Sequence, residues 1–270
     1  MQDKIIFYFI IYSFLGWCLE SVYKSIIFKK VTNSGFLYGP FCPMYGIAAV
    51  LMLMLGNISN NIFVIFIISF LWFSVWEYIV AIVLEKLFKT KYWDYSDLKF
   101  NIHGRICLKN SIYWGILGVL LIFVIQPQIE KVTHLIPSSI LIYIDVILCV
   151  AILVDMLITI SKTMSIDKKV RQVFELSENI KEKIKELKNT DVLGKNYKET
   201  TQKLIEEMKE RQYILKIKVY KRIIRLRKAF PEMNSDNIAK FMTQKIELKD
   251  IKEKIKEHKN KVKDKKRNST

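Results

Sequence analysis

The first 160 residues contain apolar stretches long enough to constrain the fold to a membrane setting. Three of them, residues 5–28, 62–84 and 139–160, are each at least about 20 residues long, the length that a helix needs to cross the hydrocarbon of a bilayer. Two shorter stretches, roughly residues 41–55 and 111–125, alternate with them. The pattern predicts an all-α fold, a polytopic membrane helix bundle of about five spans.

The two shorter stretches leave two alternatives open. Residues 36–40 can complete the second stretch, and residues 106–110 can complete the fourth, so that each crosses the membrane. Otherwise they are partly re-entrant, because about 15 residues are too few for a full span.

Net charge divides the chain into two parts. Residues 1–161 contain 11 Lys and Arg against 9 Asp and Glu, whereas residues 162–270 contain 32 against 17. A nearly neutral, apolar part is therefore joined to a strongly basic one. We expect a transmembrane bundle over residues 1–161 and a basic, helical cytoplasmic tail over residues 162–270.

The distribution of Lys and Arg predicts the orientation of the bundle. Positive residues collect in the cytoplasmic loops of membrane proteins. Residues 24–30 and 86–109 are rich in Lys and Arg, residues 56–61 contain none, and the fourth connection contains only Lys131. The pattern predicts a multi-pass protein of the cell membrane with its N-terminus outside and its tail in the cytoplasm.

Three acidic residues interrupt the apolar stretches. Glu20, Glu77 and Asp155 each lie in a different span, where an ionisable side chain costs at least ~2.5 kcal/mol near the centre. With a helix rise of ~1.5 Å per residue, all three lie roughly 9–12 Å from the predicted inner boundary. They form either one polar site open to the cytoplasm, or three separate hydrogen-bonded contacts that hold the bundle together.

The segment that leads into the second stretch is rich in Gly and Pro. Gly39, Pro40, Pro43 and Gly46 make a regular helix start difficult. Irregular backbone at this depth is tolerated where protein or a wet cavity covers it. The alternative is an ordinary helix that begins with Pro in its first turn.

The loop after the third span supplies further polar candidates. Asp94 and Arg105 can pair with each other, and Arg105 can also reach toward Glu20 or Glu77. Glu85 lies on the same polar face of the third span as Glu77, eight residues further on, at the end of that span. Asp94, Asp97 and His103 match no zinc or calcium spacing. No metal and no cofactor are therefore expected.

Several of these segments resemble one known family. The residues that carry the resemblance are 16–23, 35–46, 77–78, 84–85, 93–96 and 101–106. They are similar, in the same order, to the ABC-transporter permease family of type IV, called CmpB-like. The resemblance covers roughly residues 5–160, and it implies an integral membrane protein that acts with a separate ATPase subunit.

The tail is predicted to be helical and weakly coiled-coil. Phe241, Leu248, Ile255 and Val262 recur every seven residues, which is a heptad spacing. Residues 259–270 are expected to be disordered because they are almost entirely polar and charged.

The most basic part of the tail predicts contact with the membrane surface. Arg222, Arg225 and Arg227 alternate with apolar residues. Such a helix binds anionic headgroups at ~1 kcal/mol per basic residue. Nucleic acid also attracts positively charged helices. The tail is attached to the membrane, however, which favours lipid as its partner.

Three functions remain open from the sequence. The first is a membrane transport component in which inner-facing acids bind a cation, a proton or a cationic group of a substrate. The second is a membrane-embedded enzyme acting on a lipid-linked substrate, with Glu20, Glu77 or Asp94 as acid or base and Arg105 on phosphate. The third is a scaffold that recruits partners through its tail, and association of several copies is open in each case. No catalytic motif is recognised, which favours a role other than enzyme.

Overall fold

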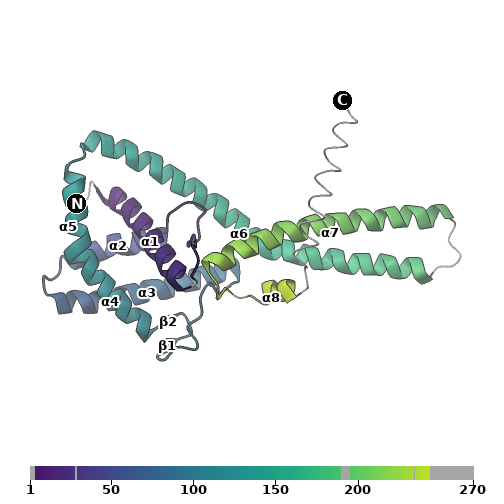
Figure 1. Cartoon of the computed structure of the whole chain (residues 1–270), viewed down its shortest axis with the longest axis horizontal. Helices are drawn as coiled ribbons and strands as arrows, with labels where there is room; N and C mark the ends of the chain where they lie inside the picture. The colour runs from purple at the N-terminus through teal and green to yellow at the C-terminus, as the bar shows by residue number, and fades with distance from the viewer. Residues whose placement is uncertain (1–3, 28, 190–194, 234, 244–270) are drawn as a thin grey trace. The chain divides into compact units, whose positions relative to one another are not determined.

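The computed structural model describes residues 4–27, 29–189, 195–233 and 235–243. The described part of the chain is mostly helical (Figure 1), so the all-α prediction is confirmed. It falls into two compact units. One comprises Met1–Met164 with Ile224–Asn234, and the other comprises Ser165–Ile223 with Ser235–Thr270.

Among the described residues, four helical stretches are long and apolar enough to cross a membrane. They are α1 (Ile5–Ile27), α3 (Ile62–Phe88), the continuous run of α4 (Leu108–Leu120), η2 (Leu121–Ile125) and α5 (Gln126–His134), and the first part of α6 (Ser138–Asn189). Each contains one of the apolar stretches predicted from the sequence. The chain is a multi-pass helical membrane protein.

The two shorter apolar stretches have different outcomes. The fourth stretch is extended at both ends, because its helix begins at Leu108 and continues to His134. The second stretch forms α2 (Pro43–Gly56), which has 14 residues and is not extended by residues 36–40. At ~1.5 Å per residue, α2 measures roughly 21 Å, which is less than the ~30 Å of a hydrocarbon core.

Helix α2 nevertheless occupies a central place, because it packs against α1, α3 and η2. Small residues allow the close approach to α1. A Cβ atom on Gly46 would collide with the Ser13 hydroxyl and lie 2.5 Å from the Phe9 carbonyl oxygen, and one on Gly16 would collide with Tyr45. On the opposite side, the Trp72 and Trp76 indoles of α3 donate hydrogen bonds to the Ala48 and Met44 carbonyls of α2.

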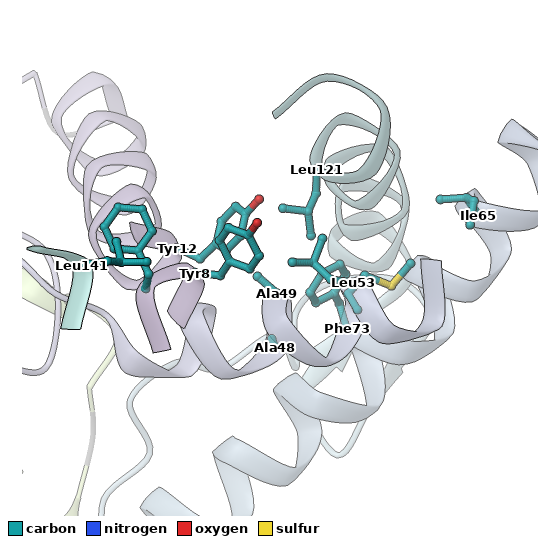
Figure 2. Close-up of a cluster of buried hydrophobic side chains, with 11 residues drawn as sticks. Tyr8, Tyr12, Ala48, Ala49, Leu53, Ile65, Phe73, Leu121 and Leu141 are labelled. Atoms are coloured by element: carbon teal, nitrogen blue, oxygen red, sulfur yellow. The ribbon is translucent and has the colours of Figure 1, made fainter. Parts of the chain in front are cut away.

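A hydrophobic core fills the bundle around α2. Its buried members come from five elements and include Phe7, Tyr8, Tyr12, Ala48, Ala49, Met52, Leu53, Ile65, Phe73, Leu121 and Leu141 (Figure 2). Met52 and Ile65 have no exposed surface. This core joins α1, α2, α3, η2 and α6 without relying on any charged residue.

One turn of π-helix, η2, interrupts the fourth span. It lies just before Pro127, which has no backbone N–H to continue a regular α-helical ladder. The Gln126 N–H bonds to the Leu121 carbonyl, five residues back, as in a π-turn. Gln126 then accepts a hydrogen bond from the Tyr12 hydroxyl at 2.5 Å and donates one to Glu130 at 2.8 Å.

The loop after α3 contains a small antiparallel hairpin that the sequence did not predict. Strand β1 (Asn101–Ile102) pairs with β2 (Ile106–Cys107). His103 and Gly104 both have positive φ, and Arg105 N–H bonds to the Ile102 carbonyl, as in a two-residue turn of the hairpin type. The hairpin gives this loop a defined structure.

The second unit is a helical hairpin with a short third helix. The C-terminal part of α6 and most of α7 (Lys195–Ala229) belong to it, together with α8 (Asp236–Thr243). Buried residues recur along α6 at Ile166, Val170 and Val173, which is the spacing of a coiled-coil contact. Phe241 is buried in α8. The other heptad positions, Leu248, Ile255 and Val262, and residues 259–270 lie outside the described residues.

Replacing Gly46 with Ala tests the close contact between α1 and α2. We expect destabilisation of about 1–3 kcal/mol, the usual cost of overpacking, because the added methyl group meets backbone at Phe9. The loss of stability is measured as the decrease in the thermal unfolding midpoint of the protein in detergent. Ile47→Ala is the control, since Ile47 is exposed; equal midpoints for the two variants would show that the contact is loose.

Candidate functional site

Glu20 of α1 lies at the junction of α1, α2 and the loop between them. The Tyr45 hydroxyl donates a hydrogen bond to Glu20 Oε1 at 2.6 Å, and the Ser34 hydroxyl donates to Oε2 at 3.3 Å. The Lys24 ammonium, one helical turn away, forms an ion pair with Oε2 at 2.9 Å. Glu20 is therefore a partly buried carboxylate with a cationic partner.

Glu77 of α3 has a different environment. Only 5% of its surface is exposed. The Trp114 indole of α4 donates to Oε2 at 2.9 Å, and the Tyr95 hydroxyl donates to Oε1 at 3.1 Å. Both donors are neutral, and no ion pair with Glu77 is found within the described parts of the chain.

The third loop positions Tyr95 above Glu77. Tyr95 N–H donates to the Gly104 carbonyl at 2.7 Å, which ties Tyr95 to the turn of the hairpin. Burial, and secondarily the charge of Glu77, raises the pKa of the Tyr95 hydroxyl above its ordinary range. Tyr95 therefore remains a neutral hydrogen-bond donor to Glu77.

Two aromatic rings connect the surroundings of Glu20 and Glu77. The Tyr45 and Trp114 ring centroids lie 5.6 Å apart. Tyr45 bonds to Glu20 and Trp114 bonds to Glu77. The structure thus brings two of the three predicted acids to opposite sides of one aromatic pair.

Asp155, the third predicted acid, has another role. Its carboxylate accepts hydrogen bonds from the backbone N–H groups of Tyr38 at 3.1 Å and Gly39 at 2.6 Å. The Thr159 hydroxyl bonds to it as well, at 3.2 Å. No contact between Asp155 and Glu20 or Glu77 is found among the described side chains. Asp155 fixes the loop between α1 and α2.

The Gly- and Pro-rich segment is irregular until Pro43, which opens α2 in its first turn. The two alternatives for this segment therefore both hold in part. Gly39 approaches Asp155 closely, since a Cβ there would lie 3.2 Å from Oδ2, and Gly46 packs on α1. Pro40 lies in the bend between them.

The polar groups of this irregular backbone have partners on neighbouring elements. Ser34 N–H donates to the Ser21 hydroxyl at 3.1 Å, and Cys42 N–H donates to the Ser13 carbonyl at 2.8 Å. Arg225 of α7 donates to the Leu37 carbonyl at 2.5 Å. Groups of α1 and α7, together with Asp155 of α6, therefore replace the missing helical hydrogen bonds.

The pairing expected between Asp94 and Arg105 is not present. Arg105 instead binds Glu85 of α3 through two nitrogens, at 3.2 Å from Nε and 2.6 Å from Nη2. Asp94 accepts hydrogen bonds from Ser96 and pairs with Lys91 at 3.4 Å. The Ser96 hydrogen bonds hold the pKa of the Asp94 carboxyl below its ordinary value. The sequence separation of 20 between Glu85 and Arg105 gave no indication of this pair.

The three arginines predicted to face lipid have separate environments. Arg225 is held by the Leu37 carbonyl, and its guanidinium lies 3.5 Å from the Tyr38 ring centre. Arg222 donates to the Ser165 hydroxyl at 2.9 Å. Arg227 has a buried Nε without a hydrogen-bond partner among the described residues. Contact of these residues with lipid stays a prediction.

The segment after Arg225 also reaches the surroundings of Glu20. The Lys24 ammonium donates to the Ala229 carbonyl at 2.5 Å and lies 4.7 Å from the Phe230 ring centre. Phe230 meets Tyr92 of the third loop edge-on, with ring centroids 5.0 Å apart. Lys24 thus joins Glu20 to the end of α7.

Four residues of this network were not identified from the sequence as site residues: Lys24, Tyr45, Tyr95 and Trp114. Lys24 had a usable signal, because it lies four residues after Glu20 on the same helix face. The aromatic residues had none, since their contacts with the acids join distant segments. No group of three or more His, Cys, Asp and Glu side chains that could hold a metal ion occurs in the described residues.

The comparison with known proteins now identifies the family. A family model described as "Putative ABC-transporter type IV" matches residues 7–160, which is more than half of the chain. The chain belongs to this family. Its match covers α1 to the membrane-spanning part of α6 and includes Glu20, Glu77 and Asp155. No curated protein and no solved structure matches the chain.

Membership in this family makes the chain an ABC-transporter-related membrane protein. The geometry described above adds a chemical property that the family name does not supply. Glu20 can hold a charge because Lys24 balances it, whereas Glu77 has only neutral donors. The two acids of the network therefore differ in what they can bind.

The Glu85–Arg105 pair can be tested through the stability of the third loop. We expect Glu85→Gln to accelerate trypsin cleavage after the exposed Lys99 by about fivefold or more, because a hydrogen bond to a charged group contributes about 1.5–3 kcal/mol. Mass spectrometry of the fragments measures the rate. Asp97→Asn is the control in the same loop, and equal rates for both variants would refute a stabilising role for the pair.

Proposed function

We propose that this protein is a membrane transport component whose inner-facing acidic site, Glu20 and Glu77, carries a proton at Glu77. One observation carries the proposal: Glu77 is buried and receives only neutral hydrogen-bond donors from Tyr95 and Trp114. A buried carboxylate without a countercharge is unfavourable, and protonation removes the charge.

A proton suits the site better than a metal cation. Hard cations such as calcium require six to eight oxygen ligands, and magnesium requires six. Glu77 and Tyr95 supply three oxygens at most, and the Trp114 indole is only a donor. A proton needs no such shell.

Glu20 complements Glu77 in this proposal because its charge is already balanced. Lys24 pairs with Glu20 and also bonds to Ala229 at the end of α7. Movement of the end of α7 would therefore change how strongly Lys24 holds Glu20. This gives the tail a means to influence the acidic site.

The roles that remain for the other predicted site residues follow from their contacts. We assign Asp155, Gly39, Pro40, Pro43 and Gly46 to the support of the irregular loop. We assign Glu85, Arg105 and Asp94 to the support of the third loop, which carries Tyr95. These residues hold the site in place and do not themselves bind the proton.

We further propose five membrane elements, with α2 as the short one, an outside N-terminus and a cytoplasmic C-terminus. The bundle is assigned to residues 1–161 and the tail to residues 162–270. The basic loops after α1 and α3 support this orientation. Association with a separate ATPase subunit and with further copies of the chain belongs to the same proposal, on the strength of the family.

The enzyme hypothesis has less support. It needs Arg105 to bind a phosphate, and Glu85 already binds that guanidinium on one side. The scaffold hypothesis rests on the helical tail alone. Removing residues 162–270 without loss of the cellular phenotype would exclude it.

Glu77→Gln tests the protonated carboxyl directly. Infrared difference spectra of the full-length protein in lipid, recorded between acidic and alkaline pH, are expected to contain a protonated carboxyl band that this variant removes. Glu178→Gln, on the exposed surface of α6, is expected to leave the band in place. A band unchanged in Glu77→Gln would overturn the proposal.

Transport can be measured with the wild type and the Glu77→Gln variant after reconstitution into liposomes. A pH-sensitive dye inside the liposomes should report proton entry under a potassium diffusion potential. We expect Glu77→Gln and the double variant Glu20→Gln with Glu77→Gln to reduce the flux at least about tenfold, since an amide cannot carry the proton. Equal flux in wild type and double variant would contradict the function.

The orientation can be mapped with single cysteines in a variant whose four native cysteines are Ser. We expect a membrane-impermeant maleimide to label Asn60→Cys in intact cells, and to label Lys99→Cys only after permeabilisation. Asn60 lies between α2 and α3, and Lys99 lies between α3 and α4. The opposite result would invert the proposed topology.

A further inference from the structure

Charge is distributed unevenly along the helical hairpin of the second unit. Residues 165–174 and 211–223 together contain eight Lys and Arg and a single acidic residue, Asp167. Residues 175–189 and 195–210, toward the other end, contain eight of each sign. The excess positive charge is therefore confined to the end that follows the membrane span.

Two contacts define how the helices pair at this end. Arg222 donates to the Ser165 hydroxyl at 2.9 Å, and Gln212 donates to the Val173 carbonyl at 3.2 Å. Residue numbers rise on α6 as they fall on α7, so the helices run antiparallel (Figure 1). Lys169 is one turn after Ser165 and Lys218 is one turn before Arg222, so these two lysines lie opposite each other.

The cations are close enough to affect one another. Burial lowers the pKa of the Lys169 ammonium, and the charges of Arg222 and Lys218 lower it further. Asp167 forms an ion pair with Arg171 at 3.0 Å. Like charges repel, and an anion bound among them would reduce the repulsion.

The cationic side chains of Lys169, Lys218 and Arg222 extend from a packed contact between α6 and α7. Ile166 and Val170 of α6 and Val219 and Ile223 of α7 are buried beside these side chains. Their packing holds the two helix backbones, and hence the cationic side chains, in one arrangement. A guanidinium and two ammonium groups on a rigid base suit the oxygens of a phosphate group.

Helix continuity indicates which phosphate is within reach. Helix α6 runs without a break from Ser138 to Asn189, and its apolar stretch ends at Ile160. Ser165 is five residues further on, roughly 7–8 Å along the helix. This is the level at which lipid headgroups border the hydrocarbon.

We propose that Ser165, Lys169, Lys218 and Arg222 form a binding site for the phosphate of an anionic phospholipid. Of the predicted lipid-facing arginines, the site includes Arg222 because it lies at the contact with Ser165, whereas Arg225 donates to the Leu37 carbonyl. It is independent of the acidic site and of transport.

The test uses full-length protein in detergent with phosphatidylglycerol as the probe. Native mass spectrometry measures lipid retention, and the triple variant Lys169→Gln, Lys218→Gln, Arg222→Gln removes the three charges. We expect phosphatidylglycerol to bind at least about tenfold more weakly to this variant, because each basic residue near the surface strengthens the binding of an anionic lipid. Phosphatidylcholine should bind both proteins weakly and equally.

A matched variant distinguishes lipid binding at one site from a general effect of the positive charge of the hairpin. Lys181→Gln, Lys203→Gln and Lys209→Gln remove three exposed charges from the other end of the hairpin and should leave phosphatidylglycerol binding within about twofold. If this variant loses as much binding as the first, the proposed site is overturned. Glycerol 3-phosphate, a soluble phosphate ester, distinguishes a lipid headgroup from a soluble phosphate as the ligand. If it displaces phosphatidylglycerol with an affinity equal to that of the lipid, the ligand is a soluble phosphate and the lipid assignment is wrong.

A second readout guards against misfolding. In lipid-free detergent the first variant should keep its helical circular dichroism and unfold at an equal or higher temperature, because repulsion is removed. Phosphatidylglycerol should raise the unfolding temperature of the wild type and of the matched variant, but not of the first variant. Equal stabilisation of all three proteins would overturn the proposal.

Discussion

Irregular backbone beside the hydrocarbon requires a hydrogen-bond partner for each of its polar groups, and the segment between α1 and α2 depends on this constraint. Asp155 accepts two of its N–H groups, Ser21 accepts a third, and Arg225 donates to a carbonyl. These partners come from α6, α1 and α7. Once the loop is fixed, α2 begins at Pro43 and Tyr45 lies against Glu20. The acidic network therefore rests on hydrogen bonds made outside it.

The two acids show how one bundle provides two electrostatic environments. Glu20 has Lys24 one turn away, so its charge has an oppositely charged partner. Glu77 is more fully buried than Glu20, and it accepts hydrogen bonds from the Trp114 indole and the Tyr95 hydroxyl. The hairpin of the third loop, which Glu85 and Arg105 anchor, sets the position of Tyr95. A loop outside the spans thus controls the surroundings of a residue inside one.

The sequence predicted local features well and long-range contacts poorly. Apolar stretches predicted α1, α3 and the membrane part of α6, because hydrophobic length is a property of one segment. The same reasoning identified Glu20 and Glu77 as unusual. It placed Asp155 with them on depth and on a broad polar helix face, yet neither determines which neighbouring element that face meets. The Arg105 partner was missed because the loop folds into a hairpin, and two-residue strands leave little periodicity to detect.

The hydrophobic core beside the N-terminal half of α1 has an electrical consequence. Its α1 members, Phe7, Tyr8 and Tyr12, pack with Met52 of α2, and they precede Glu20 by eight residues or more, at least roughly 12 Å along the helix. Voltage falls mainly across regions that exclude water and ions, where it acts with ~2.3 kcal/mol per elementary charge for each 100 mV. On the proposed topology, a proton that reaches Glu77 from the cytoplasm crosses the smaller part of this field, and one that leaves toward the outside crosses the larger part. The outward step would therefore be the one on which the membrane potential acts more strongly.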